Sequence, residues 1–331
     1  MQPLFFCVTG DKIFMLKYTI KRLLQSVVTI FLIATAVFVL IRMLPPEKFY
    51  FDPDEQMLLS DEAKEGILRE DGLLDPMPEQ LLRFYKDTLK GDFGVSRRIQ
   101  RDAPVTKLIS KKVDISMRNG AMALGIALVV GASMGVFQTL FKDKLFDHIG
   151  TGYTVLIRAV PTIVSYSLVL VFGSKVLGLP SLYSTRKGAI SNIMPVFCLS
   201  MVSIAGYALW TRRYMVDELN KDYIKMARLK GLSSRQILFR HVLKNAFVPL
   251  VQYLPASLLD TIGGSLLVER FFSVPGMGTF LADAISAYDV NIVQTLSLLY
   301  ATLGVLGTFL GDVLMTAIDP RITLTKKEES R

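Results

Sequence analysis

Six long apolar runs divide the sequence, and they constrain its fold more than any other feature. They span residues 23–40, 119–141, 152–173, 188–211, 246–268 and 290–318. A helix needs about 20 apolar residues to cross the ~30 Å hydrocarbon core of a bilayer. Inside that core the backbone must satisfy its own hydrogen bonds, so runs of this length are expected to be helical. The sequence therefore predicts an all-α polytopic membrane protein with six transmembrane helices.

The composition agrees with membrane insertion. Hydrophobic residues make up 51% of the 331 residues and the mean hydropathy is +0.41, which is too apolar for a soluble domain of this size. The net charge of +9 would suggest nucleic-acid binding in a soluble protein, but here Lys and Arg gather beside the apolar runs. Cys7 and Cys198 cannot support a disulfide framework, because Cys198 lies inside an apolar run.

The basic residues also predict the topology. Lys17, Lys21 and Arg22 precede the first run and place the N-terminus in the cytoplasm. Six crossings from there put the C-terminus in the cytoplasm as well and make residues 212–245 a cytoplasmic loop. That loop is strongly basic, which agrees with the positive-inside rule. Pro161 falls within the third run, where we expect a kink.

This topology divides the chain into four segments. Residues 1–14 fit poorly with the rest of the sequence, and we expect a non-essential extension before a natural start at Met15. Residues 15–44 contain the first transmembrane helix. Residues 45–118 have nearly balanced charges and are expected to form a large, folded extracytoplasmic insert, with a turn at residues 91–96. Residues 119–331 form the core with helices 2 to 6.

The predicted cytoplasmic loop contains a charged segment, residues 222–235, with the periodicity of an amphipathic helix. Its apolar positions are Tyr223, Met226, Ala227 and Leu229, and its basic positions are Lys225, Arg228 and Lys230. We predict Asp222 as its N-cap and Gly231 as its C′ residue in the left-handed conformation, with Ser233 or Ser234 capping a second helix. A short helix held between two spans suits a docking site for another protein. The alternative is an ordinary basic loop.

Residues 131–135 match the Gly-x-Ser-x-Gly pattern of a hydrolase nucleophile, but they lie in the middle of a predicted span. The same two glycines form a Gly-x-x-x-Gly face for helix packing, which we favour. His148 and His241 are the only two histidines that could act as a base, and both lie at predicted ends of spans. The sequence therefore disfavours an intramembrane serine hydrolase.

Asp260 and Asp312 lie within apolar runs, where an ionisable residue is a functional candidate by default. Asp312 lacks the Gly-x-Gly-Asp surroundings of an aspartyl intramembrane protease. We expect Asp312 to pair with a cation or with the backbone, and we regard Asp260 as a candidate for lining a translocation path.

The sequence contains no Gly-x-x-x-x-Gly-Lys-Ser/Thr loop and no zinc-type His/Cys cluster. We therefore expect the chain itself to bind no nucleotide or metal cofactor. No filter motif or ring-forming acidic repeat supports a channel. Active transport would take its energy from an ion gradient or from another chain.

Several motifs, in order, resemble those of one family. Residues 222–233 and 240–249 resemble the cytoplasmic EAA loop of ABC importer permeases, in the form of the oligopeptide, dipeptide and nickel group and of its peptide-permease B type. Three further motifs agree: residues 91–96 with Gly-Asp-Leu-Gly-x-Ser, residues 269–278 with Glu-x-x-Phe-x-x-Pro-Gly-x-Gly, and residues 319–321 with a terminal Asp-Pro-Arg. The resemblance covers nearly the whole chain from Met15.

Two departures from the broad family narrow the subgroup. Where the broad family has Glu-Ala-Ala, this chain has Lys225, Met226 and Ala227, and residues 241–244 replace its Ile-x-Leu-Pro. Ala227 and Gly231 are kept. The peptide-type subgroup commonly has this variant. The Glu of the broad family's Glu-Ala-Ala motif has no acidic counterpart in this chain, so its role in the family is not carried over to any residue here.

The resemblance implies a type I ABC importer permease fold in the bacterial cytoplasmic membrane. It implies partners as well: a homologous second permease, two ATPases that bind ATP and Mg, and an extracytoplasmic binding protein. The ATPase would hold the helix at 222–229 in a groove, through Asp222, Tyr223, Lys225, Met226, Ala227, Arg228 and Gly231. The binding protein would face the insert and a turn at Glu269, Pro275, Gly276 and Gly278.

The resemblance also implies a substrate class, with oligopeptides or dipeptides as the first choice. Importers of nickel chelates or oligosaccharides are alternatives within the family. A secondary transporter is the alternative outside it, but the internal repeat that such transporters usually carry is not visible. The exact substrate does not follow from the permease, because these importers take most of their selectivity from the binding protein.

Overall fold

The protein is described by a computed structural model over residues 5–51, 57–262 and 265–318. Within these ranges it consists of helices joined by turns, with one isolated backbone bridge between Val95 and Pro104. Residues 1–4 of the predicted extension and the terminal motif at 319–321 lie outside the described residues. The prediction of an all-helical protein is confirmed.

Five helical segments are long and apolar enough to cross a membrane. They are Lys17–Arg42 within α1 (Phe5–Arg42), the segment Val105–Leu140, the segment Thr185–Leu219 with α10 (Ile193–Leu219), the segment Ser234–Leu259, and α16 (Val290–Ile318). A sixth span exists if α8 (Leu145–Ala159) and α9 (Thr162–Lys175) are counted together. The described residues therefore provide five to six spans, and α16 has the bounds predicted for the last of them.

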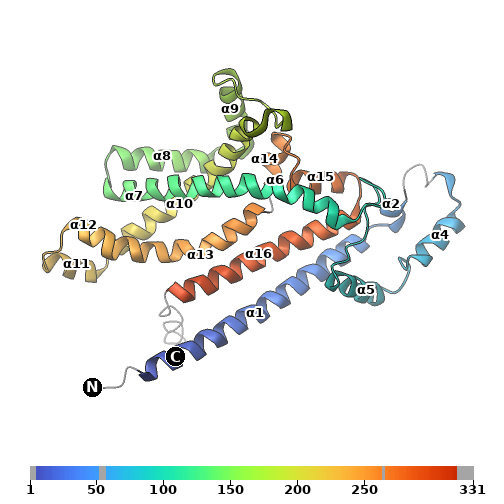
Figure 1. Ribbon diagram of the computed structural model, residues 1–331, viewed down its shortest axis with the longest axis horizontal. Helices are drawn as coiled ribbons and strands as arrows, with labels where there is room; N and C mark the ends of the chain where they lie inside the picture. The colour runs from blue at the N-terminus through green and yellow to red at the C-terminus, as the bar shows by residue number, and fades with distance from the viewer. Residues whose placement is uncertain (1–4, 52–56, 263–264, 319–331) are drawn as a thin grey trace.

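The third predicted span is not a single helix. The chain bends by 112° between its two halves, α8 and α9, and α9 projects from the side of the bundle (Figure 1). Val160 between them is extended, with φ −79° and ψ 131°. The following Pro161 has no N–H to donate and keeps the residue before it out of the helical region. The kink predicted at Pro161 is therefore a sharp elbow.

The second and fifth spans begin well before the apolar runs that predicted them. The second starts at Val105 in α6 (Val105–Ile126) and continues through η1 (Ala127–Gly131) and α7 (Ala132–Leu140). The fifth starts at Ser234 in α12 (Ser234–Ile237) and continues through η3 (Leu238–Val242) into α13 (Leu243–Ile262). It was predicted at 246–268. Both helices extend through polar residues beyond the apolar stretch. Hydropathy predicts which part of a helix lies in the membrane, and it does not predict where the helix ends.

The spans pack as a bundle in which α16 lies between α1 and α13, and α10 lies against α6, α7, α8 and α13 (Figure 1). Gly131 and Gly135 allow the close approach to α10. A Cβ atom on Gly135 would lie 2.6 Å from the carbonyl oxygen of Ala208, and one on Gly131 would lie 2.8 Å from that of Ile204. Ser133 between them is exposed. The packing role predicted for these glycines is confirmed.

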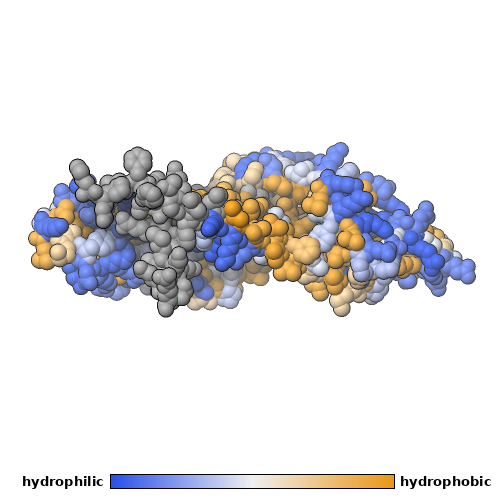
Figure 2. All heavy atoms as spheres, turned by 90° about the horizontal axis from the view of Figure 1, so that it is seen from below, coloured by the Kyte–Doolittle hydropathy of each residue, from blue (hydrophilic) through white to orange (hydrophobic). Residues whose placement is uncertain are grey.

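The two ends of the bundle carry different structures (Figure 1). One end carries α11 (Asp222–Leu229) and α12, and we call it the α11 end. The other carries α2 (Pro46–Tyr50), α4 (Asp61–Glu70) and α5 (Met77–Leu89), and we call it the α5 end. Hydrophobic residues gather in the middle of the molecule and hydrophilic ones toward the α5 end (Figure 2). This band of exposed apolar surface suits a lipid environment.

The segments that follow α9 and α13 also carry short helices. These are η2 (Thr185–Asn192), α14 (Leu266–Phe271) and α15 (Met277–Ser286). Side chains from α6, α15 and α16 share one buried core, whose members include Val105, Met277 and Ile292. The turn between α14 and α15 is therefore fixed to α6 and α16.

Candidate functional site

α11 is a short helix held by its neighbours at both ends. Lys221 precedes it in an extended conformation, so Lys221 and not Asp222 occupies the N-cap position. Asp222 is the first helical residue, where a carboxylate interacts favourably with the helix dipole, and it lies 2.8 Å from Lys225 Nζ. The N-cap prediction for Asp222 is wrong by one position.

Gly231 ends α11 in the way the sequence predicts. Its φ is +78°, in the left-handed region. Its N–H donates to Arg228 O at 2.9 Å, and the N–H of Leu232 donates to Ala227 O at 3.2 Å. This pair of bonds is a Schellman motif, and Leu232 completes it by packing into the same core as Ala227.

The next helix starts immediately after this turn. The Ser233 hydroxyl accepts from the N–H of Gln236 at 3.3 Å, and the Gln236 side chain accepts from the N–H of Ser233 at 2.9 Å. This capping box confirms Ser233 as the cap. The Schellman motif at the end of α11 and the capping box at the start of α12 therefore fix the direction in which α11 leaves the membrane helices.

The inner face of α11 is buried against the chain itself. Ile224 is fully buried and Ala227 is 8% exposed, and both pack against Met215 of α10 and Val242 of η3. Ala227 was predicted to rest in a partner's groove, and its burial contradicts that placement. Ile224 was missed, although its three-residue spacing from Ala227 places both on one helical face.

The outer face of α11 is apolar and uncovered. Tyr223, Met226 and Leu229 are 39%, 56% and 83% exposed. Lys225 and Arg228 lie exposed beside them. We call Tyr223, Met226 and Leu229 the α11 patch. An exposed apolar patch with a charged rim is typical of a protein–protein contact.

A buried carboxylate holds the base of α11. Glu218, near the end of α10, is 5% exposed. Its Oε1 accepts hydrogen bonds from the Tyr223 hydroxyl and, at 3.0 Å, from Asn245 Nδ2, while Lys221 Nζ lies 2.6 Å from its Oε2. Asn245 Nδ2 also donates to the Tyr223 hydroxyl at 2.8 Å. Partial burial and the bond to Glu218 raise the pKa of Tyr223 to about 12.

This triangle joins three helices, because Glu218 belongs to α10, Tyr223 to α11 and Asn245 to α13. Sequence reasoning missed it. Glu218 and Asn245 are 27 positions apart, so no local periodicity relates them.

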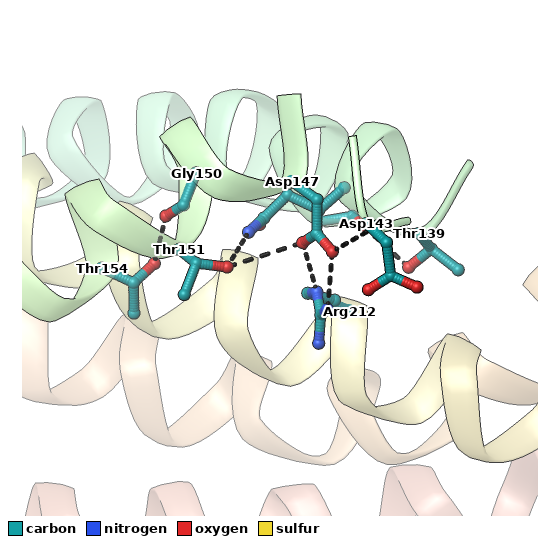
Figure 3. Close-up of polar contacts among 9 residues, drawn as sticks. Thr139, Asp143, Asp147, Gly150, Thr151, Thr154 and Arg212 are labelled. Atoms are coloured by element: carbon teal, nitrogen blue, oxygen red, sulfur yellow. Dashed lines mark hydrogen bonds and ion pairs between the residues drawn. The ribbon is translucent and has the colours of Figure 1, made fainter. Parts of the chain in front are cut away.

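A second polar cluster joins the start of α8 to α10 (Figure 3). Asp147, in the first turn of α8, is 3% exposed. Arg212 of α10 donates to both of its oxygens, from Nε to Oδ1 at 2.7 Å and from Nη2 to Oδ2 at 2.8 Å. The backbone N–H of Asp143 donates to Oδ2 at 3.1 Å, which fixes the loop between α7 and α8. The pair therefore ties α8 to α10, the helix that also carries Glu218.

A buried carboxylate holds the turn at residues 269–278 from inside. Glu269 is 3% exposed and accepts from Ser116 Oγ at 2.6 Å, from Gly278 N at 2.8 Å and from Thr279 N at 3.2 Å. A Cβ atom on Gly276 would collide with the Glu269 carboxylate, and one on Gly278 would lie 2.7 Å from Leu266 Cα. Burial raises the pKa of Glu269, and these donors oppose the shift.

This burial corrects the surface role predicted for three residues of the turn, whereas a binding protein in front of the turn stays a prediction. Glu269, Gly276 and Gly278 lie inside the molecule, and Pro275 alone of the four predicted residues is partly exposed. The three buried residues position the turn, and they do not form a surface.

Comparison with known proteins identifies the family. A model of the family described as "Binding-protein-dependent transport system inner membrane component" matches residues 127–324, more than half of the chain, including all of α11. The oligopeptide transport system permease protein OppB of Haemophilus influenzae is 31% identical over 309 residues, which cover 93% of this chain and 99% of that protein. The dipeptide transport system permease protein DppB of Lactococcus lactis is 31% identical over 311 residues, which cover 94% of this chain and 100% of that protein. The chain belongs to this family.

The permease is thus a multi-pass inner-membrane transport subunit and not an enzyme, and its family implies ATPase and binding-protein partners. Asp260 belongs to α13, but its side chain lies outside the described residues, so its path-lining role stays a prediction. Asp312 is 7% exposed, lies 3.3 Å from Arg22 Nη1 and accepts from Gln252 Nε2 at 3.0 Å. The predicted cation partner of Asp312 is therefore confirmed as Arg22, which links α1 to α16.

The motif at residues 91–96 forms a turn, as predicted. Gly91 and Gly94 have φ of +76° and +72°. Ser96 Oγ donates to Asp289 Oδ2 at 2.6 Å, and Asn291 Nδ2 donates to Val95 O at 2.8 Å. The turn is therefore fixed to the start of α16 in the permease.

Proposed function

We propose that the permease forms half of the translocation path of an ATP-driven ABC importer for oligopeptides or dipeptides. Relatives named as oligopeptide and dipeptide permeases align over nearly their whole length, which supports this substrate class. The other half of the path would come from a homologous second permease. ATP and Mg²⁺ would be bound by two ATPase subunits, and a binding protein would deliver the peptide.

The exposed α11 patch carries the proposal. Tyr223, Met226 and Leu229 present apolar surface, while Ile224 and Ala227 hold the opposite face against the membrane helices. We assign the patch to a groove of an ATPase, with Lys225 and Arg228 at its rim. Asp222 and Gly231 position the helix ends. In this arrangement the α11 end is cytoplasmic, the α5 end is extracytoplasmic, and both chain termini lie in the cytoplasm.

The triangle at Glu218 supplies the coupling. When the two ATPases close on ATP, α11 is carried with them. Glu218 transmits that displacement to α10 and Asn245 transmits it to α13, because both side chains bind the Tyr223 hydroxyl or each other. Packed helices have discrete arrangements, so the bundle responds by rocking between states and not by bending locally.

ATP-driven uptake in proteoliposomes tests this function. The complete assembly, with its binding protein outside and ATP inside the vesicles, should accumulate labelled tri-alanine. Accumulation should stop without ATP or without the binding protein. Uptake that follows an ion gradient and ignores ATP would contradict the proposal, and so would uptake of a nickel chelate or an oligosaccharide with none of any peptide.

A further inference from the structure

A cavity of about 240 Å³, with a mixed polar and apolar lining, lies between the parts of α6, α10, α13 and α14 nearer the α5 end. Its polar lining comes from all four helices: Ser116, Asn119, Ser203, Ser257, Ser265 and Glu269. Polar side chains are costly within a membrane and face the bundle interior where they serve a function. The convergence of polar side chains from four helices on one cavity therefore calls for an occupant.

Asn119 supplies the observation that points to a ligand. Its side chain is 3% exposed and lines the cavity, and its Oδ1 atom is buried without a hydrogen-bond partner in the described part of the chain. A buried carbonyl oxygen left without a donor is unfavourable. Asn119 and Ser116 are three residues apart on α6, so Asn119 lies on the same face as the serine that binds Glu269.

The cavity offers acceptors and negative charge. Glu269 accepts three hydrogen bonds, so one of about four acceptor positions on its carboxylate is left. The hydroxyl of Ser116 is already donated to Glu269, and Ser257 Oγ accepts from the Tyr207 hydroxyl at 2.9 Å. Among the described residues that line the cavity, none is Lys, Arg or His. A cationic group with several N–H donors matches this lining.

The size of the cavity limits what can enter. Water takes about 30 Å³ per molecule in the liquid, so the space exceeds that of a few waters. Pockets that hold a whole drug-sized ligand are larger, about 300–1,000 Å³. The cavity therefore holds one end of a peptide and not an entire oligopeptide.

We propose that this cavity binds the free N-terminal ammonium group of a peptide during transport, with Asn119 Oδ1 and the Glu269 carboxylate as its acceptors. The inference rests on the proposed peptide-transport function. It adds a recognition site inside the permease, on the α5 side of the bundle, which a peptide would reach after leaving the binding protein. A charge-assisted hydrogen bond to the ammonium group gives the site its preference.

The test uses the complex of this permease with its partner permease and ATPases in nanodiscs, without the binding protein, so that selectivity of the binding protein does not intervene. Isothermal titration compares tri-alanine with N-acetyl-tri-alanine. Wild type should bind tri-alanine at least about tenfold more tightly, because acetylation removes the charge and two of the donors.

Asn119→Leu should abolish this difference. Asn192→Leu is the matched control, since Asn192 is also buried with an unpartnered Oδ1 but does not line the cavity, and it should keep the difference. Equal binding of the two peptides by wild type would overturn the proposal, as would discrimination that survives Asn119→Leu. Loss of tri-alanine binding when sodium chloride is added at a concentration equal to that of the peptide would overturn the proposal and reassign the cavity to a monovalent ion. If ATP-driven uptake of tri-alanine persists in any of these cases, the site fails and the proposed function stands.

Discussion

The carboxylate of Glu218 and the side-chain amide of Asn245 lie 3.0 Å apart and join α10 to α13 at the base of α11. Both also bind the hydroxyl of Tyr223. A displacement of α11 therefore reaches two membrane helices through one set of side chains.

Asn245→Leu should uncouple the ATPases from transport. The variant removes the bond between α13 and the other two helices but leaves the α11 patch unchanged. We expect normal co-purification of the ATPases and a fall of about tenfold or more in peptide-stimulated ATP hydrolysis, for a coupling energy of ~1.4 kcal/mol or more. Unchanged stimulation in this variant would remove the triangle from the coupling route.

Gly231→Ala should destabilise the end of α11 through its backbone alone. A Cβ atom there would meet nothing within 4 Å, but φ is +78°. The left-handed conformation costs a non-glycine residue about 1–2 kcal/mol. Gly206→Ala is the control, because Gly206 lies inside α10 with open space around it and should be neutral or stabilising. Thermal unfolding in detergent compares the two variants, and equal melting temperatures would argue against a strained turn at Gly231.

Arg212→Lys should loosen α8 from α10. A lysine ammonium cannot make the two parallel hydrogen bonds that Arg212 donates to Asp147, so the variant should lose about 1–2 kcal/mol of stability. The neighbouring Arg213 is exposed and lies over the ring of Trp210, so Arg213→Lys should cost less than about 1 kcal/mol. Urea unfolding measures both variants. A larger loss of stability in Arg213→Lys than in Arg212→Lys would show that the buried pair of Asp147 and Arg212 contributes little.

The pH dependence of stability should reveal Glu269. Burial raises its pKa in the folded state. A carboxyl group with a raised folded pKa contributes stability that is present below its unfolded pKa and is lost as the pH rises through the folded pKa. Glu269→Gln does not titrate, so its melting temperature should fall less than that of wild type between pH 4 and pH 7. Parallel melting curves across this range would contradict the assignment.

The membrane helices were predictable from hydropathy, and the last of them, α16, has the predicted bounds at Val290 and Ile318. Hydropathy could not predict where α13 begins, since its helix continues from the polar residues after Ser233. The elbow at Pro161 was foreseen as a kink only, because a proline predicts a break in the helix but not the angle of 112°.

Sequence signals correctly predicted the C-terminal end of α11, but they did not predict which of its side chains are buried. Gly231 and Ser233 act through their immediate neighbours, so their roles followed from the sequence. The burial of Ala227 and Ile224 depends on α10 and η3, which lie elsewhere in the chain. The same reason hid the partners of Glu269, which come from α6 and α15.

The most direct test of the account is whether the α11 patch holds an ATPase. Leu229→Asp and Leu89→Asp form a matched pair, because both leucines lie at the C-terminal ends of helices and are 83% and 87% exposed, at opposite ends of the bundle. Tagged permease carrying either change would be purified in mild detergent and the recovered ATPase quantified by mass spectrometry. The account predicts wild-type recovery with Leu89→Asp and at least about a tenfold loss with Leu229→Asp, since a charge placed in an apolar contact must be desolvated. Wild-type recovery of the ATPase with Leu229→Asp would contradict the docking role of α11.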